Sequence, residues 1–351
     1  GVALGPFGFK VVPDINVVSE ISHIGIVFLL FLLGLDMQPK SLKGLFKEVS
    51  STAIISSVLF ASLGYSLGLA FDFTQTEALV LGMALMFSST IIGIKLLPTT
   101  VLHHKQTGEL MVGLLLFQDF LAIICLLILA SGTPGQFNMS ELGLAFLALP
   151  ALGIAAFAFV KYVLLKLITR FDRFHEYIFL LAIGWCLGLA ELAELMHLSA
   201  EIGAFIAGIS LATSPISQFI ALNLKPLRDF FLILFFFALG AQLNIGLLPE
   251  LALPIIAVSG LVLVTKPVAF YALLCRKNER KGLAWDIGFR LGQISEFSLL
   301  LAIVASSNDL IGERVKVIIQ SAAIVTFLIS SYIVIFCFPN PIAVSERLRR
   351  D

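Results

Sequence analysis

Long apolar runs alternate with short polar stretches along the whole chain. Most runs approach the roughly 20 residues that an α-helix needs to cross the hydrocarbon core of a bilayer. Three of them are short or are interrupted by polar residues. The pattern predicts an all-α polytopic membrane protein with about eleven complete spans, near residues 21–36, 49–71, 77–97, 108–131, 141–168, 174–195, 199–213, 229–243, 251–275, 284–306 and 315–338.

Composition strengthens this prediction. Of the 351 residues, 59% are hydrophobic and 13% are charged, whereas a soluble domain is about 25% charged. This apolar composition makes the lipid bilayer the expected partner. The formal net charge is zero, so we expect no nucleic-acid partner. The cysteines lie in or at the end of apolar runs without metal-ligand spacing. We therefore expect no cofactor and no metal beyond a transported ion.

The basic residues indicate how the chain crosses the membrane. Of 23 lysines and arginines, seventeen fall in alternate loops that begin after the first span, and only three fall in the opposite loops. Because cytoplasmic loops carry the excess of Lys and Arg, this split predicts a cytoplasmic carboxyl terminus. We expect the protein to lie in the inner (plasma) membrane of the cell. The chain begins inside the end of an apolar segment without a Met, so we expect that its first helices are absent.

One carboxylate lies deep within an apolar run. Asp119, with Gln118 beside it, sits in the middle of span 108–131. A charge at that depth costs about 2.5–3.5 kcal/mol on insertion scales, so it indicates a site on an ion or proton pathway. The structural alternative is a static salt bridge between helices. Lys266, well inside span 251–275, is the natural counter-charge in either case.

Two spans carry polar interruptions, one in each half of the chain. Hydroxyl side chains compete for backbone hydrogen bonds and weaken a helix, and paired interruptions in corresponding positions indicate an inverted-repeat transporter with a site near the midplane. Each motif alone is also compatible with ordinary helix packing. The candidate ion ligands are Ser88, Ser89 and Thr90 in the first interruption, and Gln293, Ser295 and Glu296 in the second, with Arg290 as an accessory charge.

These motifs resemble those of the monovalent cation:proton antiporter-2 family, in particular its Kef-like potassium/proton branch. Phe117-Gln118-Asp119 is similar to the Gln-Asp pair of its potassium-type members, and Ser88-Ser89-Thr90 is similar to its broken-helix signature. Further stretches match in the same order, at residues 24–36, 201–208, 227–240 and 293–297.

The resemblance implies an inverted-repeat antiporter fold with two broken crossing helices, about thirteen spans in the full chain, and a homodimer. Residues 49–131 and 251–338 would form a mobile core, residues 21–36 and 174–243 a dimer scaffold, and residues 141–168 a connecting helix. Asp119 would carry the cation or proton, Lys266 would be its counter-charge, and Gln118 a selectivity neighbour. The soluble regulatory domain that many members carry is absent from these residues.

We therefore expect a secondary transporter, not an enzyme, that exchanges potassium for protons by alternating access. A single carboxylate on the path favours electroneutral exchange, with a role in pH homeostasis. A sodium/proton antiporter on the same fold is the first alternative, and only Gln118 argues against it. A ligand-gated cation channel and a transporter-shaped sensor are the others.

Overall fold

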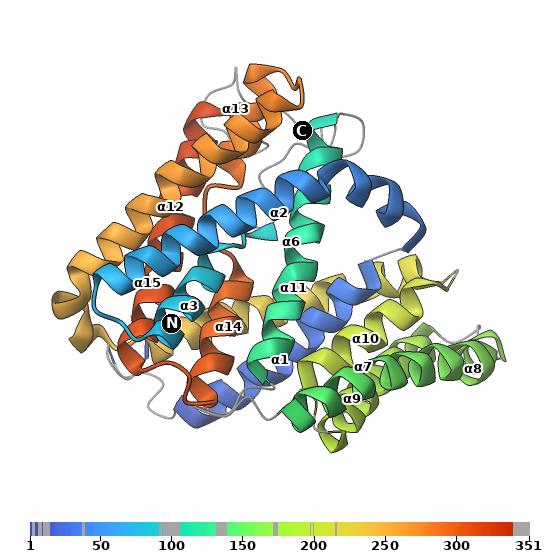
Figure 1. The fold of residues 1–351 in the computed structure, drawn as a ribbon. Helices are drawn as coiled ribbons and strands as arrows, with labels where there is room; N and C mark the ends of the chain where they lie inside the picture. Colours follow the sequence, from blue (N-terminus) through green and yellow to red (C-terminus); the bar gives the residue numbers. More distant parts are fainter. Residues whose placement is uncertain are drawn as a thin grey trace. The chain divides into compact units, whose positions relative to one another are not determined.

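The structure is a computed structural model that describes residues 1, 4–5, 9, 15–36, 39–90, 93, 106–130, 139–170, 175–196, 198, 200–214 and 216–339. Regular secondary structure within these ranges is entirely helical (Figure 1). In chain order the elements are α1 (Ile15–Asp36), α2 (Pro39–Ala70), α3 (Gln75–Leu85), α6 (Gln106–Ala130), α7 (Met139–Phe159), the π-helix η1 (Val160–Leu164), α8 (Leu165–Arg170), α9 (His175–Leu195), α10 (Ala200–Ala212), α11 (Ser217–Gln242), the 3₁₀-helix η2 (Ile245–Leu247), α12 (Leu248–Arg276), α13 (Lys281–Arg290), α14 (Glu296–Ser307) and α15 (Glu313–Cys337).

The described helices have the length and composition of membrane spans. Five windows within them are long and apolar enough to cross a bilayer, at Val49–Ala70, Ala148–Ile168, Tyr177–Leu195, Ile245–Arg276 and Glu313–Cys337. Shorter apolar helices cover Leu110–Leu126, Ala200–Ala212 and Glu296–Ser307. The predicted all-α membrane class is confirmed, and the total number of spans stays a prediction.

The chain divides into two compact units. Unit 1 comprises Gly1–Leu42 and Ala130–Ile245, and unit 2 comprises Lys43–Leu129 and Gly246–Asp351. Unit 1 is therefore built from α1 and from α7 to α11, and unit 2 from most of α2, from α3 and α6, and from α12 to α15. Each unit combines segments that lie far apart in the sequence.

In unit 1, α10 is the central helix, and it packs against α1, α7 and α9. The contact with α1 is close because two glycines face each other: a Cβ atom added at Gly34 would collide with the Phe205 carbonyl, and one added at Gly208 with the Phe31 carbonyl. Small residues that let two backbones approach are a general device of membrane-helix packing. Helix α11 packs on the other side of α1, where Phe28 and Phe231 stack at 5.1 Å.

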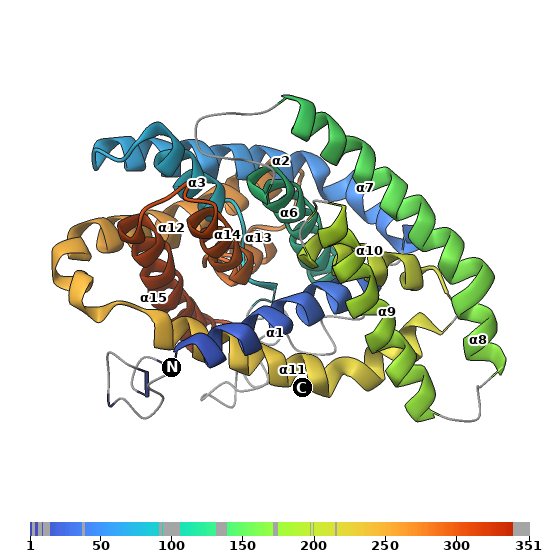
Figure 2. The same cartoon turned by 90° about the horizontal axis from the view of Figure 1, so that it is seen from below.

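Unit 2 contains the same order of elements twice. A long helix (α2 or α12) is followed by an interrupted crossing, which begins with α3 or α13, and then by a second long helix (α6 or α15). Helix α12 packs against α13 and α15, while α14 packs against α15 and α3 (Figures 1 and 2). The core between these elements includes Met111, Leu114, Phe270 and Ile287, all fully buried.

The prediction for α11 was wrong at its amino-terminal end. The sequence pattern placed this span at 229–243, but the helix begins at Ser217. Lys225, Arg228 and Asp229 lower the average hydropathy of its first half, although Ile220 and Leu224 are buried on one face. Pro226 lies inside the helix, where it removes one N–H group without ending the helix.

Candidate functional site

Both predicted interruptions are unwound segments inside unit 2. Helix α3 ends at Leu85, the backbone of Phe87–Ser89 is not helical, and the helical conformation resumes at Thr90. Helix α13 ends at Arg290, and α14 begins after Ser295, whose side chain accepts a hydrogen bond from the Phe297 N–H at 3.1 Å. The prediction of two broken crossing helices is confirmed.

The two unwound segments lie against each other. The Ser88 hydroxyl donates to the Leu291 carbonyl at 2.8 Å, and the Gln293 amide nitrogen donates to the Ser89 carbonyl at 3.4 Å. Ser88, Ser89, Gln293 and Ser295 are all completely buried. Unwound backbone at membrane depth persists only where protein or a water-filled cavity satisfies its polar groups, and here the segments partly satisfy one another.

Lys266, which lies on α12, joins the two unwound segments. Its ammonium donates to the Phe87 carbonyl at 2.6 Å and to the Gln293 carbonyl at 2.9 Å, and it lies 3.3 Å from the Ser88 hydroxyl. The side chain is completely buried. Because these carbonyls have lost their helical partners, they are free to accept from the ammonium, which holds one segment to the other.

Asp119 lies on α6 and is also completely buried. The Thr90 hydroxyl lies 3.0 Å from one of its carboxylate oxygens and 3.2 Å from the other. The Asp119–Lys266 ion pair suggested by the sequence is not formed, because Lys266 binds the carbonyls of the unwound segments. Lys266 therefore does not hold the Asp119 carboxylate.

Gln118 contacts the first unwound segment directly. Its side-chain oxygen accepts a hydrogen bond from the Ser88 N–H at 3.1 Å. Its side-chain nitrogen is buried without a hydrogen-bond partner among the described residues, which is unusual for a buried donor. Gln118 thus fixes the backbone of the first segment next to Asp119.

Glu296 and Arg290 flank the second unwound segment. The Glu296 carboxylate, in the first turn of α14, lies within electrostatic range of Asp119. Arg290, at the end of α13 and 1% exposed, donates to the Asp286 carboxylate and to the Pro339 carbonyl, each at 2.7 Å. Arg290 therefore ties down the end of α13, and Glu296 is a second acid within electrostatic range of Asp119.

Two hydroxyl residues of α15 support the second segment and were missed in the sequence. The Ser330 hydroxyl donates to the Gln293 side-chain oxygen at 2.9 Å, and the Thr326 hydroxyl accepts from the Ile294 N–H at 3.2 Å. Their spacing of four residues places them on one face of the helix. That spacing within an apolar run was the only signal of their role.

The polar groups that the site presents are mainly oxygen atoms. Carboxylate, hydroxyl and carbonyl oxygens converge where the helices are interrupted, and such hard ligands suit alkali cations. Among the described residues, no group of three or more His, Cys, Asp and Glu could hold a metal ion. The basic residue Lys95, at the end of the first interrupted span, and His103 and His104 in the polar stretch that follows lie outside the described residues.

Two unwound crossings around a buried carboxylate, within an all-α membrane fold, define a secondary ion transporter. The sequence matches the family described as "Sodium/hydrogen exchanger, transmembrane" over residues 1–338. The chain belongs to this family.

The fold also resembles a solved structure, that of the sodium proton antiporter MjNhaP1 from Methanocaldococcus jannaschii at pH 8. The TM-score is 0.70 at 17% sequence identity, over 95% of this chain and 87% of that chain. This match establishes the antiporter fold for the present chain.

Proposed function

We propose that this protein exchanges a monovalent cation for protons across the membrane at Asp119. The observation that carries the proposal is the buried Asp119 carboxylate, which is hydrogen-bonded to Thr90 and leaves the Lys266 ammonium to other partners. A carboxylate in this position binds a proton or a cation, and one displaces the other. Competition for a single site couples the two fluxes.

The role of Lys266 follows from its contacts. Its charge is stabilised by the Phe87 and Gln293 carbonyls, so binding of a cation at Asp119 does not require an ion pair to break first. We propose that Lys266 has a structural role, in which its ammonium holds the two unwound segments together. The Thr90 hydroxyl supplies a neutral oxygen ligand beside the carboxylate.

Alternating access requires one part of the chain to move against another. We propose that the helices of unit 2, near 49–131 and 251–338, form the mobile core because all the site residues belong to them. Residues 21–36 and 174–243 of unit 1 would form the scaffold of a homodimer, with 141–168 as the connecting helix. The positive-inside charge pattern supports a cytoplasmic carboxyl terminus.

The transported cation is sodium or potassium. Sodium is named both in the description of the matching family and in that of MjNhaP1, whereas potassium and the Kef-like branch rest on the Gln118-Asp119 pair. The Gln118 side-chain oxygen already accepts a hydrogen bond from the Ser88 N–H. Gln118 therefore has a structural role that is the same whether sodium or potassium is transported. Sodium therefore has at least as much support as potassium as the transported cation.

An exchange assay in proteoliposomes identifies the ion. The purified chain is reconstituted with a trapped pH indicator and a preset pH gradient, and sodium, potassium, lithium or choline is added outside. We expect one or more alkali cations, but not choline, to dissipate the gradient. Cation uptake without proton movement, at rates far above those of carriers, would indicate a channel and contradict the proposal.

The same vesicles report the stoichiometry. One-for-one exchange at Asp119 moves no net charge, so an imposed membrane potential leaves the exchange rate unchanged. A rate that depends on the potential would show that a second proton moves, and Glu296 would then be its candidate carrier. Loss of that dependence in Glu296→Gln would assign the second proton to Glu296.

A further inference from the structure

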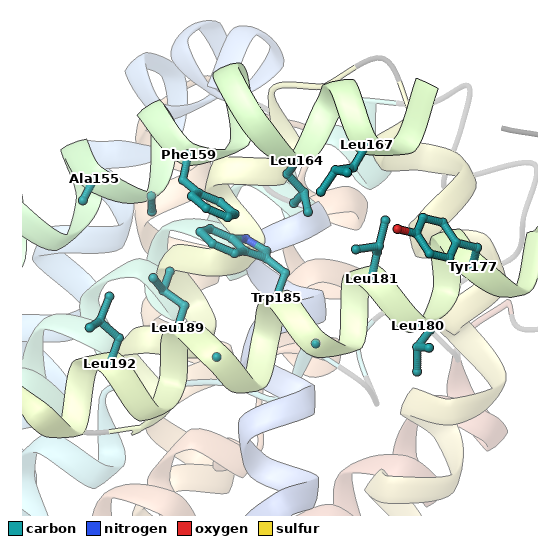
Figure 3. A pocket seen from close by; sticks show the side chains of 13 residues that line it. Ala155, Phe159, Leu164, Leu167, Tyr177, Leu180, Leu181, Trp185, Leu189 and Leu192 are labelled. Atoms are coloured by element: carbon teal, nitrogen blue, oxygen red, sulfur yellow. The ribbon is translucent and has the colours of Figure 1, made fainter. Parts of the chain in front are cut away.

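Unit 1 contains an open apolar groove that the transport site does not use. It has a volume of about 530 Å³ and lies between the segment formed by α7, η1 and α8 and the facing helix α9 (Figure 3). Its walls include Ala155, Phe159, Leu164 and Leu189. Helix α10, which contacts both α7 and α9, supports it from behind.

The floor of the groove is rigid. The Phe159 ring stacks on Trp185 with centroids 5.0 Å apart and planes 3° from parallel, as Figure 3 shows. The Trp185 indole N–H lies 3.2 Å from the Ala207 carbonyl and 3.3 Å from the Ser210 hydroxyl, both on α10. The aromatic pair is thereby fixed to a third helix, and the groove does not close by simple rotation of a side chain.

Two local features keep the groove open. Gly184 and Gly188, one turn apart on α9, both line it, and a Cβ atom at either position would meet nothing within 4 Å. On the opposite wall, the π-helical turn is marked by the Leu165 N–H bond to the Val160 carbonyl. This wide turn shifts the register by one residue, so that Leu164 rather than Val163 follows Phe159 along the groove.

Among the side chains that the structure describes, the exposed charges near the two ends of the groove have opposite signs. Lys166 and Arg170, both exposed, lie on α8 beside the end lined by Leu167 and Tyr177. Figure 3 shows the Tyr177 hydroxyl directed toward Leu181 at that end. At the other end, α9 carries the exposed Glu191 and Glu194.

We propose that this groove binds one anionic phospholipid, with an acyl chain along the Phe159–Trp185 floor and the headgroup phosphate at Lys166 and Arg170. The apolar walls of the groove match the chemistry of lipid acyl chains. Basic residues between membrane helices at one interface bind anionic headgroups. The acidic residues at the opposite end disfavour the reversed orientation. This site is independent of which cation is exchanged.

The acyl-chain part is tested with the full chain in nanodiscs that contain equal amounts of phosphatidylglycerol and phosphatidylethanolamine. After transfer to mild detergent, native mass spectrometry counts the lipids that stay bound. We expect one retained phosphatidylglycerol per chain, and its loss in Gly188→Leu, because the new side chain fills the groove. The matched control is Gly153→Leu on α7, which also has open space at its Cβ but lies outside the groove lining.

The headgroup part is tested by removing two positive charges. The double variant Lys166→Ala/Arg170→Ala is expected to lower the preference for phosphatidylglycerol over phosphatidylethanolamine by about thirtyfold. The control, Arg276→Ala/Lys281→Ala, removes the same charge from exposed positions of unit 2 and is expected to leave the preference unchanged.

Equal lipid retention in Gly188→Leu and Gly153→Leu would overturn the proposal, as would equal retention of the two lipids by the unmodified chain. A change from dimer to monomer in Gly188→Leu, with no lipid bound to the unmodified chain, would assign the groove to a second copy instead. Where Gly188→Leu fails to fold, Gly184→Leu blocks the same groove one turn away.

Discussion

At the scale of single residues, Lys266 shows how a buried charge is accommodated without an opposite charge in contact. Its ammonium binds two carbonyls that the interruption of α3 and of the α13–α14 crossing has released. Burial of an ammonium is costly unless it is hydrogen-bonded. The unwound segments and the lysine therefore stabilise each other.

This arrangement predicts the effect of Lys266→Met, which keeps most of the side-chain volume and removes the donor. Two buried carbonyls lose their partner, so we expect a loss of about 2–4 kcal/mol in stability. Thermal unfolding in detergent measures it, with the exposed Lys281→Met as the control. An unchanged melting temperature in Lys266→Met would show that the carbonyl contacts do not stabilise the protein.

Ser88 provides a second test at this scale. Its hydroxyl donates to the Leu291 carbonyl across the two segments, so Ser88→Ala is expected to cost about 1–2 kcal/mol and to reduce exchange. Ser62→Ala is the matched control, since the exposed Ser62 hydroxyl donates to the Leu59 carbonyl of its own helix. Equal melting temperatures in the two variants would contradict a structural link between the segments.

At the scale of elements, glycines set the distance between α2 and α3. A Cβ atom at Gly82 of α3 would lie 2.6 Å from the Ala61 carbonyl of α2. The backbones of the two helices are therefore in contact near the end of α3, just before the first interruption.

Gly82→Ala is accordingly expected to destabilise the protein by about 1–3 kcal/mol through overpacking. Gly260→Ala on α12 is the control, because a Cβ atom there meets nothing within 4 Å. In that helix, Ala is expected to be neutral or stabilising by up to about 1 kcal/mol. Thermal unfolding of both variants measures the difference in stability. A Gly82→Ala protein as stable as Gly260→Ala would refute the close contact between α2 and α3.

The elements also show what sequence can and cannot predict. Ser88–Thr90 and Gln293–Glu296 stood out as polar groups in apolar runs, and the backbone is unwound at Ser88 and Ser89 and at Gln293–Ser295. The partners of Lys266 could not be predicted, because backbone carbonyls leave no mark in a sequence and depend on how the crossings meet. Thr326 and Ser330 were missed because hydroxyl residues are common in ordinary membrane helices.

At the scale of the whole molecule, the ion site and the lipid groove lie in different units. The residues around Asp119 belong to unit 2, and the groove between α7 and α9 belongs to unit 1. Variants of one site are therefore expected to leave the chemistry of the other intact. Gly188→Leu tests this expectation in the exchange assay, where altered cation selectivity would contradict it.

The central claim is that Asp119 carries both the cation and the proton. The most direct measurement compares cation-driven proton flux in proteoliposomes of the unmodified chain, Asp119→Asn and Asp72→Asn. Asp72 lies in an exposed turn with φ 59°, a conformation that Asn also tolerates. We predict that Asp119→Asn folds normally and shows no exchange, while Asp72→Asn retains it. Exchange near the unmodified rate in Asp119→Asn would contradict the claim.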